Sequence, residues 1–201
     1  MTNKHINCSG CKINDCYSGE DCVRGYDFEK YIPMSGKAFD NKENKLILEV
    51  STQLEGEHYM QLTRLEEIIV FAKNMGYKKV GIAHCVGLIN EANIIKKILD
   101  QHFTVYTICC KFSGIDKKDY DLKQIKDDRY EAICNPVGQA MVLNDLKTDL
   151  NLIVGLCMGH DILFNKYSEA PVSTFIVKDR ITGHNPAAAI YSGYHRKKMG
   201  I

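Results

Sequence analysis

The chain has 201 residues, of which 45% are hydrophobic and 25% charged, so it can bury one good core and a small appendage. Its 26 basic and 25 acidic residues leave a formal charge of +1, and no long-range field favours nucleic acid or an anionic membrane surface. No apolar run approaches the roughly 20 residues that span a bilayer, and no signal-peptide pattern opens the chain. We therefore expect one main domain in the cytoplasm, with no nucleic-acid partner and no membrane contact.

Cysteine is unusually abundant, with nine residues in the chain. An odd number fits poorly with a fully paired disulfide framework. In a reducing compartment, the same abundance indicates metal binding or catalysis. We interpret the cysteines as ligands or reactive thiols.

Residues 1–40 contain four cysteines and little apolar periodicity, so a bound metal is the feature that would order them. Cys8, Cys11, Cys16 and Cys22 have the spacing Cys-x2-Cys-x4-Cys-x5-Cys, close enough to surround one ion or cluster. Zinc sites usually pair two Cys-x2-Cys knuckles, and this segment has one such pair. The spacing therefore favours an iron–sulfur cluster and leaves zinc as the alternative.

Helices and strands alternate from about residue 41 onward. Thr63 and Glu66 form a capping-box pattern at the start of a helix, and Asn135-Pro136 is typical of the first positions of another. Helices are expected at about 43–56, 63–76, 87–99, 135–146, 162–164 and 185–190, and strands at 79–85, 103–109, 151–157 and 173–177, with a further short segment at 130–134.

This alternation predicts an α/β fold, because parallel strands need crossover connections. We expect a mostly parallel sheet of about four or five strands with helices on both faces, in a domain of residues 41–201. The small cysteine-rich lobe of residues 1–40 precedes it.

The remaining cysteines follow the predicted strands. Cys85 follows the first strand, Cys109 and Cys110 the second, Cys134 the short segment, and Cys157 the next strand. Ligands of parallel sheets bind beside the carboxyl ends of the strands, which suggests a second site there. Cys85, Cys110, Cys134 and Cys157 are the candidate ligands of a cluster, and a dithiol or a reactive thiolate is the alternative chemistry. Each thiol taken singly is equally well explained as a buried core residue.

Acid–base residues adjoin these cysteines. His84 precedes Cys85, and His160 with Asp161 follows Cys157, so all three are candidate catalytic residues. A hydrogen-bonded core histidine explains His84 equally well. The Lys178-Asp179-Arg180 triplet, with His184 beyond it, brings charge to the same edge, although such triplets are more often solvated turns.

The motifs together resemble a known group of sequences. They are Cys8-Ser9-Gly10-Cys11 with Cys16 and Cys22, Ile82-Ala83-His84-Cys85, Cys134-Asn135-Pro136 with Gln139-Ala140, Gly155-Leu156-Cys157-Met158-Gly159-His160-Asp161, and Lys178-Asp179-Arg180 with His184-Asn185-Pro186. Over nearly the whole chain they resemble a prokaryotic family of unknown function that is catalogued as predicted metal-binding proteins. The resemblance implies metal binding and a ligand role for the matched cysteines, and it implies no particular reaction.

These observations predict an iron–sulfur protein, with a 4Fe-4S cluster and a cysteine-lined site for redox or Lewis-acid chemistry on a small molecule. An iron-sulfur-dependent redox or lyase-type enzyme is the favoured class, and its partner is a small-molecule substrate or a redox partner protein. The alternative is a zinc-stabilised interaction or metal-handling protein without catalysis. Sequence signatures of nucleotide, dinucleotide and serine-nucleophile sites are absent. The spacing fixes neither the substrate nor the oligomeric state.

Overall fold

The computed structural model describes residues 7–19 and 30–201 and divides the chain into two compact units, residues 1–53 and 54–201. The first unit contains two 3-10 turns, η1 (Cys8–Gly10) and η2 (Asp15–Ser18), and the helix α1 (Tyr31–Ala38). The helix α2 (Lys42–His58) begins in the first unit and crosses the division. The sequence pattern did not predict α1.

The second unit follows the predicted alternation. Its elements are α3 (Arg64–Asn74), β1 (Lys79–His84), η3 (Val86–Leu88), α4 (Ile89–Leu99), β2 (Thr104–Cys109), η4 (Lys117–Tyr120), α5 (Pro136–Asp145), β3 (Leu150–Val154), α6 (His160–Tyr167), β4 (Val172–Ile176), α7 (Ala187–Tyr191) and α8 (Gly193–Lys198). The capping box of Thr63 and Glu66 starts α3, and the Asn135 side chain caps α5.

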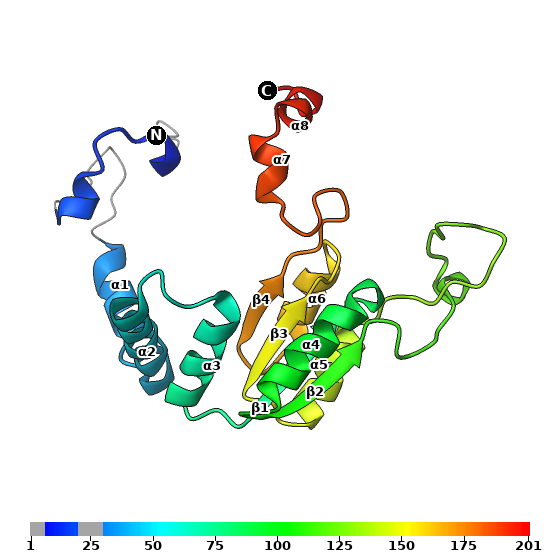
Figure 1. Ribbon diagram of the computed structural model, residues 1–201, viewed down its shortest axis with the longest axis horizontal. Coiled ribbons are helices and arrows are strands. Elements are labelled where there is room, and N and C mark those ends of the chain that lie inside the picture. The colour runs from blue at the N-terminus through cyan, green and yellow to red at the C-terminus, as the bar shows by residue number, and fades with distance from the viewer. Residues whose placement is uncertain (1–6, 20–29) are drawn as a thin grey trace. The chain divides into compact units, whose positions relative to one another are not determined.

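The four strands form one sheet in the order β2-β1-β3-β4, and every pairing is parallel (Figure 1). Parallel crossovers are right-handed, and the chain moves one way from β1 to β2 and the other way from β2 to β3 and β4. The crossover helix α4 therefore covers one face of the sheet, and α5 and α6 cover the other. Contact between α5 and α6 agrees with this placement.

The predicted α/β class and the mostly parallel sheet with helices on both faces are confirmed. All five residues of β3 are buried, as its near-continuous apolar sequence indicates, and the buried set includes the polar Asn151. In the described residues, segment 130–134 adds no strand to the sheet and pairs through one isolated antiparallel bridge, between Asp116 and Ala132. Within the described ranges, no helix combines the length and the apolar character that a membrane crossing requires.

Candidate functional site

β1 and β3 are parallel neighbours in the sheet, but the connections that follow them run to opposite sides: β1 leads to β2 on one side, and β3 leads to β4 on the other. In open parallel sheets, such an arrangement leaves a crevice at the carboxyl ends of the two strands, where ligands bind. Cys85 directly follows β1 at this point, and Gly155, Leu156 and Cys157 follow β3. The most cysteine-rich edge of the sheet is therefore also its topological binding position.

Three thiols gather at this edge. The Cys110 side chain hydrogen-bonds to both Cys85 and Cys134, and so occupies the middle of the group. We call Cys85, Cys110 and Cys134 the thiol triad. Backbone hydrogen bonds position it: Cys110 N donates to His84 O at 2.9 Å, and Asn135 N donates to Cys110 O at 2.9 Å.

The triad stabilises thiolates at its two ends. The hydrogen bond to Cys110 lowers the pKa of Cys85 to about 5, against the effect of burial, and the Gly87 N–H and Lys178 add to the lowering. The pKa of Cys134 is lowered to about 4, first by Cys110 and then by His160. The pKa of Cys110 is raised by its hydrogen bonds to Cys134 and Cys85 and by burial. The central thiol therefore keeps its proton and donates to a thiolate.

Backbone N–H groups also reach the sulfur atoms. Val86 N lies 3.3 Å from Cys110 Sγ, and the Gly87 N–H hydrogen-bonds to Cys85. Both N–H groups come from η3, the turn that directly follows β1. Such N–H to sulfur bonds favour the thiolate form and tune the potential of a metal bound to it.

His160 completes one end of the triad. It is the first residue of α6, and its imidazole hydrogen-bonds to Cys134, which raises the pKa of His160. Lys111 also acts on Cys134 by charge and by a hydrogen bond. The pair is a thiolate beside an imidazole that can hold and release a proton.

Lys178 approaches the other end of the triad between two glycines. A Cβ on Gly87 would lie 3.5 Å from Lys178 Nζ and 4.0 Å from Cys85 Sγ. A Cβ on Gly155 would lie 3.6 Å from Lys178 Cδ and 2.1 Å from Leu88 Cδ1, and Gly155 has a left-handed φ of +67°. The absence of side chains at both glycines therefore opens the path along which the lysine reaches Cys85.

Arg180 lies near the triad from the exposed side. Its Nη2 donates to Cys157 Sγ at 3.3 Å. The pKa of the guanidinium is raised, first by this hydrogen bond, then by the charge of Cys157, and further by the charges of Cys85 and Cys134. Arg180 therefore contacts Cys157 and acts on both ends of the triad by charge.

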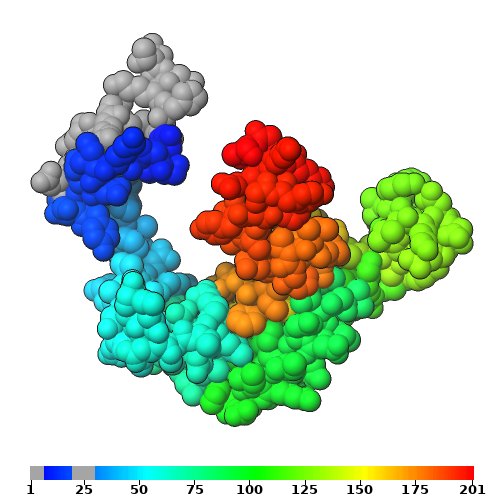
Figure 2. All heavy atoms as spheres, turned by 45° about the horizontal axis from the view of Figure 1, so that its top comes forward, coloured from blue at the N-terminus to red at the C-terminus, as the bar shows by residue number. Residues whose placement is uncertain are grey.

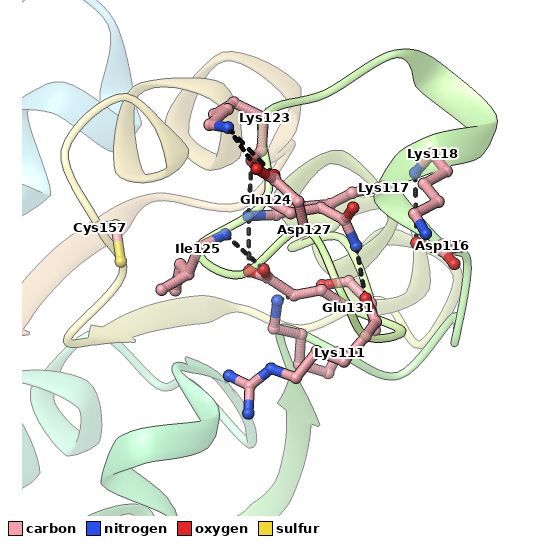
Figure 3. A network of polar contacts seen from close by, with 12 residues as sticks. Lys111, Asp116, Lys117, Lys118, Lys123, Gln124, Ile125, Asp127, Glu131 and Cys157 are labelled. Carbon is pink, nitrogen blue, oxygen red and sulfur yellow. Dashed lines mark hydrogen bonds and ion pairs between the residues drawn. The ribbon is translucent and has the colours of Figure 1, made fainter.

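A long loop, residues 111–133, joins Cys110 to Cys134. Its base is closed by Lys117 N to Glu131 O at 3.0 Å and Ile133 N to Ile115 O at 2.8 Å. The Glu131 carboxylate pairs with Lys117 Nζ at 2.6 Å and accepts from Ile125 N at 2.7 Å (Figure 3). In Figure 2 the loop, in lime green, protrudes from the surface as a separate lobe. The closed base fixes the ends of the loop, and with them two of the three thiols.

Gln139 of α5 supports the site through hydrogen bonds to the strands, and the sequence analysis did not assign it this role. It is fully buried, and its Nε2 donates to Ile108 O at 2.7 Å and His84 O at 3.3 Å. Its Oε1 has no hydrogen-bond partner among the described residues. Its role could have been suspected from the sequence, because Gln139 is a polar residue in the first turn of the helix that begins after Cys134-Asn135. Lys111 was also missed, and its position directly after Cys110 was its signal.

The structure separates the predicted inner ligands into two groups. It brings Cys85, Cys110 and Cys134 together and leaves Cys157 with Arg180. Cys109, the last residue of β2, is instead partly buried against the hydrophobic core. None of these five cysteines forms a disulfide within the described residues.

The three predicted catalytic residues have different environments. His160 contacts the triad directly. His84 is buried, with its Nδ1 3.1 Å from Cys85 O, as the core-histidine interpretation has it. The Asp161 carboxylate accepts from Gly159 N at 2.9 Å and Ile162 N at 2.8 Å, so it caps α6 and acts on His160 by charge.

The predicted N-terminal site lies partly outside the described residues, since Cys22 is not among them. Cys8 and Cys16 are exposed, and Cys11 is half-buried. Over residues 7–19 and 30–201, no three His, Cys, Asp or Glu side chains converge as ligands of a single metal ion. The four-cysteine site therefore stays a prediction.

Comparison with known proteins gives the family. The model of a family described as "Protein of unknown function (DUF1847)" matches residues 25–175, which include the whole triad. The chain belongs to the DUF1847 family. It is also 54% identical, over 194 residues, to the uncharacterized protein MJ0455 of Methanocaldococcus jannaschii, covering 96% of this chain and 98% of that protein. No solved structure matches the chain. The resemblance to a family of unknown function is confirmed, and metal binding is left to the proposal below.

Proposed function

We propose that this DUF1847 protein binds an iron–sulfur cluster, of the 4Fe-4S type, at Cys85, Cys110 and Cys134, and carries out redox or Lewis-acid chemistry on a small molecule. The observation that carries the proposal is the thiol triad itself. Cys85 follows β1, Cys110 and Cys134 stand at the two ends of the loop 111–133, and all three lie at the topological binding position of the sheet.

The donor chemistry of the triad fits a cluster. Metal ligands are thiolates, and the surroundings of Cys85 and Cys134 already stabilise that form. Lys111, Lys178 and His160 offset the negative charge that three bound thiolates bring. Ligands of one zinc ion must converge on a single point, at about 2.3 Å from the metal. No described group does so, whereas the thiolates of a cluster bind different iron atoms.

The chemistry proposed for the site divides between the cluster and the chain. A cluster held by three cysteines has one iron without a protein ligand, which supplies a Lewis-acid or electron-transfer position. His160 lies beside Cys134 and is placed to hold or deliver a proton. Arg180 keeps Cys157 engaged at 3.3 Å, apart from the three proposed ligands. This division favours an iron-sulfur-dependent redox or lyase-type enzyme.

A specific observation favours a second candidate, a dithiol redox centre without metal. Cys134 has a strongly lowered pKa and lies beside Cys110, which still carries a proton. The Cys134 thiolate and the Cys110 thiol would form a disulfide by exchange with a disulfide oxidant, whose S–S bond breaks. The pair gives up two electrons and the Cys110 proton, and solvent supplies the second proton of the reduced oxidant. The N-terminal cysteines would then hold zinc or a cluster by themselves, as in a metal-handling protein.

Iron and acid-labile sulfide measured on anaerobically purified protein test the proposal. The key pair of variants is Cys110→Ser and Cys109→Ser, because these neighbours differ in membership of the triad. A variant with serine at Cys8, Cys11, Cys16 and Cys22 isolates the inner site. We expect iron and visible absorbance to persist in this variant and in Cys109→Ser, and the inner cluster to be lost in Cys110→Ser.

Two results would overturn the cluster proposal. One is equal iron and sulfide in the Cys110→Ser and Cys109→Ser proteins, with circular dichroism showing that both are folded. The other is a colourless inner site that forms a reducible disulfide between Cys110 and Cys134, seen as a mass decrease of two hydrogen atoms, which would support the dithiol centre.

A further inference from the structure

Two cations, Lys178 and Arg180, contact cysteines of the thiol site, and neither is paired with a carboxylate in the described part of the chain. Within residues 7–19 and 30–201, no carboxylate forms an ion pair with either side chain. Lys178 contacts Cys85, and Arg180 contacts Cys157. The positive charge is therefore directed at the thiols of the site, and no carboxylate of the described residues neutralises it.

The intervening residue, Asp179, is held away from both cations. Its Oδ1 accepts from Ile181 N at 2.9 Å and Thr182 N at 3.1 Å. Its own backbone N donates to His184 Nδ1 at 3.1 Å, and His184 N donates to Asp179 O at 2.7 Å. An Asp between Lys and Arg would be expected to pair with one of them. These four hydrogen bonds instead close a turn, and the Asp179 carboxylate accepts from backbone N–H groups of that turn.

The two cations present their charge in different ways. Lys178 is half-buried and threads past Gly155 and Gly87, so its ammonium group is fixed beside Cys85. Arg180 is exposed, and among the described residues one hydrogen bond of its guanidinium is found, to Cys157. The guanidinium has five N–H donors in a planar fork that matches the two oxygens of a carboxylate or phosphate.

We propose that Lys178 and Arg180 bind the carboxylate or phosphate group of an anionic small-molecule substrate of the thiol site. Lys178 supplies a fixed charge, and Arg180 supplies a fork that turns from Cys157 to the ligand. The inference rests on the proposed function in taking the triad as the reacting centre. It does not depend on which metal, if any, the triad binds.

The test uses Cys157 as a reporter, because it contacts Arg180 and lies outside the triad. The purified full-length protein is alkylated with iodoacetate, which carries a carboxylate, or with neutral iodoacetamide, and modification of Cys157 is followed by peptide mass spectrometry. In both reactions the thiolate displaces iodide. The rate with iodoacetate is divided by the rate with iodoacetamide. This ratio is then divided by the ratio measured for Cys157 in the unfolded chain, which removes the difference in intrinsic reactivity between the two reagents.

We expect the normalised ratio to favour iodoacetate by about tenfold, since hydrogen bonds to charged groups contribute this much to binding. In Lys178→Met and Arg180→Met it should fall to within about twofold of the unfolded chain. Lys97→Met, which removes an exposed charge from α4, should keep the full preference. If Arg180 serves only to activate Cys157, its replacement slows both reagents equally and leaves the ratio unchanged, which overturns the proposal.

Protection experiments distinguish the two anion classes. Acetate and inorganic phosphate are each added before iodoacetamide, and the effective anion should slow modification of Cys157 in wild type and not in Arg180→Met. Protection by neither anion, together with a ratio near one, refutes the anion site. Iron content is measured separately, so a high ratio in a colourless protein refutes the cluster alone, and a ratio near one in an iron-loaded protein refutes the anion site alone.

Discussion

Replacing Gly155 by alanine should destabilise the protein by about 2–5 kcal/mol. The left-handed φ of +67° costs an L-residue about 1–2 kcal/mol. The new Cβ would lie 2.1 Å from Leu88 Cδ1, and Leu88 is only 1% exposed, so overpacking adds about 1–3 kcal/mol. For a chain of this size, the melting temperature should fall by roughly 5–15 °C. Urea denaturation followed by circular dichroism measures the loss.

Two further variants separate strain from overpacking. Gly76 has a comparable φ of +75° but open space around its Cβ position, so Gly76→Ala should show the strain alone, about 1–2 kcal/mol. In a cycle with Leu88→Ala, the double variant should be less destabilised than the sum of the single variants by about 1–3 kcal/mol. If Gly155→Ala costs no more than Gly76→Ala and the cycle shows no coupling, the reasoning about the Leu88 contact is refuted.

Two other predictions concern the site. In metal-free protein, alkylation of Cys134 by iodoacetamide should already be independent of pH well below neutrality, because its pKa is about 4 and the reactive thiolate predominates above that value. Removing the imidazole donor in His160→Gln should raise the pKa of Cys134 and slow its reaction at pH 5, and a wild-type rate that keeps rising to pH 9 would contradict this. Glu131→Gln should speed hydrogen exchange at the Ile125 amide, which loses a carboxylate acceptor, and unchanged exchange by mass spectrometry or NMR would show that the loop holds without it.

Much of the fold follows from local pattern. The apolar residues of β3, which only Asn151 interrupts, and the caps of α3 and α5 reflect burial and hydrogen bonding within short segments, so the sequence alone predicts them. The helix α1 was missed because Pro33 and Gly36 lower its helix propensity, although Pro is tolerated in a first turn.

The composition of the site depends on longer-range geometry. Position after a strand placed Cys85, Cys110 and Cys157 at one edge of the sheet, whereas the segment before Cys134 adds no strand to the sheet among the described residues. Which of them meet is decided by the order of the strands and by the backbone after β3, and neither is visible in the spacing of cysteines.

The surroundings of the thiols depend on glycines, whose lack of a side chain leaves room for Lys178, and on hydrogen bonds within one turn. The approach of Lys178 requires two positions without side chains, Gly87 and Gly155, about 70 residues apart in sequence (155 minus 87 is 68). The separation of Asp179 from the cations depends on hydrogen bonds within its own turn. A charged triplet therefore looks the same in sequence whether its acid neutralises the neighbouring bases or leaves them available.

The closed base of loop 111–133 makes the rest of that loop a natural place to engineer the protein. Ile125 is 81% exposed, and Lys123 and Asp127 pair with each other at the surface. A peptide tag or a fluorescent reporter inserted after Asp127 would extend a segment whose two ends are already clamped together, and lengthening a closed loop costs little free energy. Because the closed base lies between the insert and the two thiols, the spacing of Cys110 and Cys134 should be unaffected, and the chemistry of the site should proceed as in the unmodified chain.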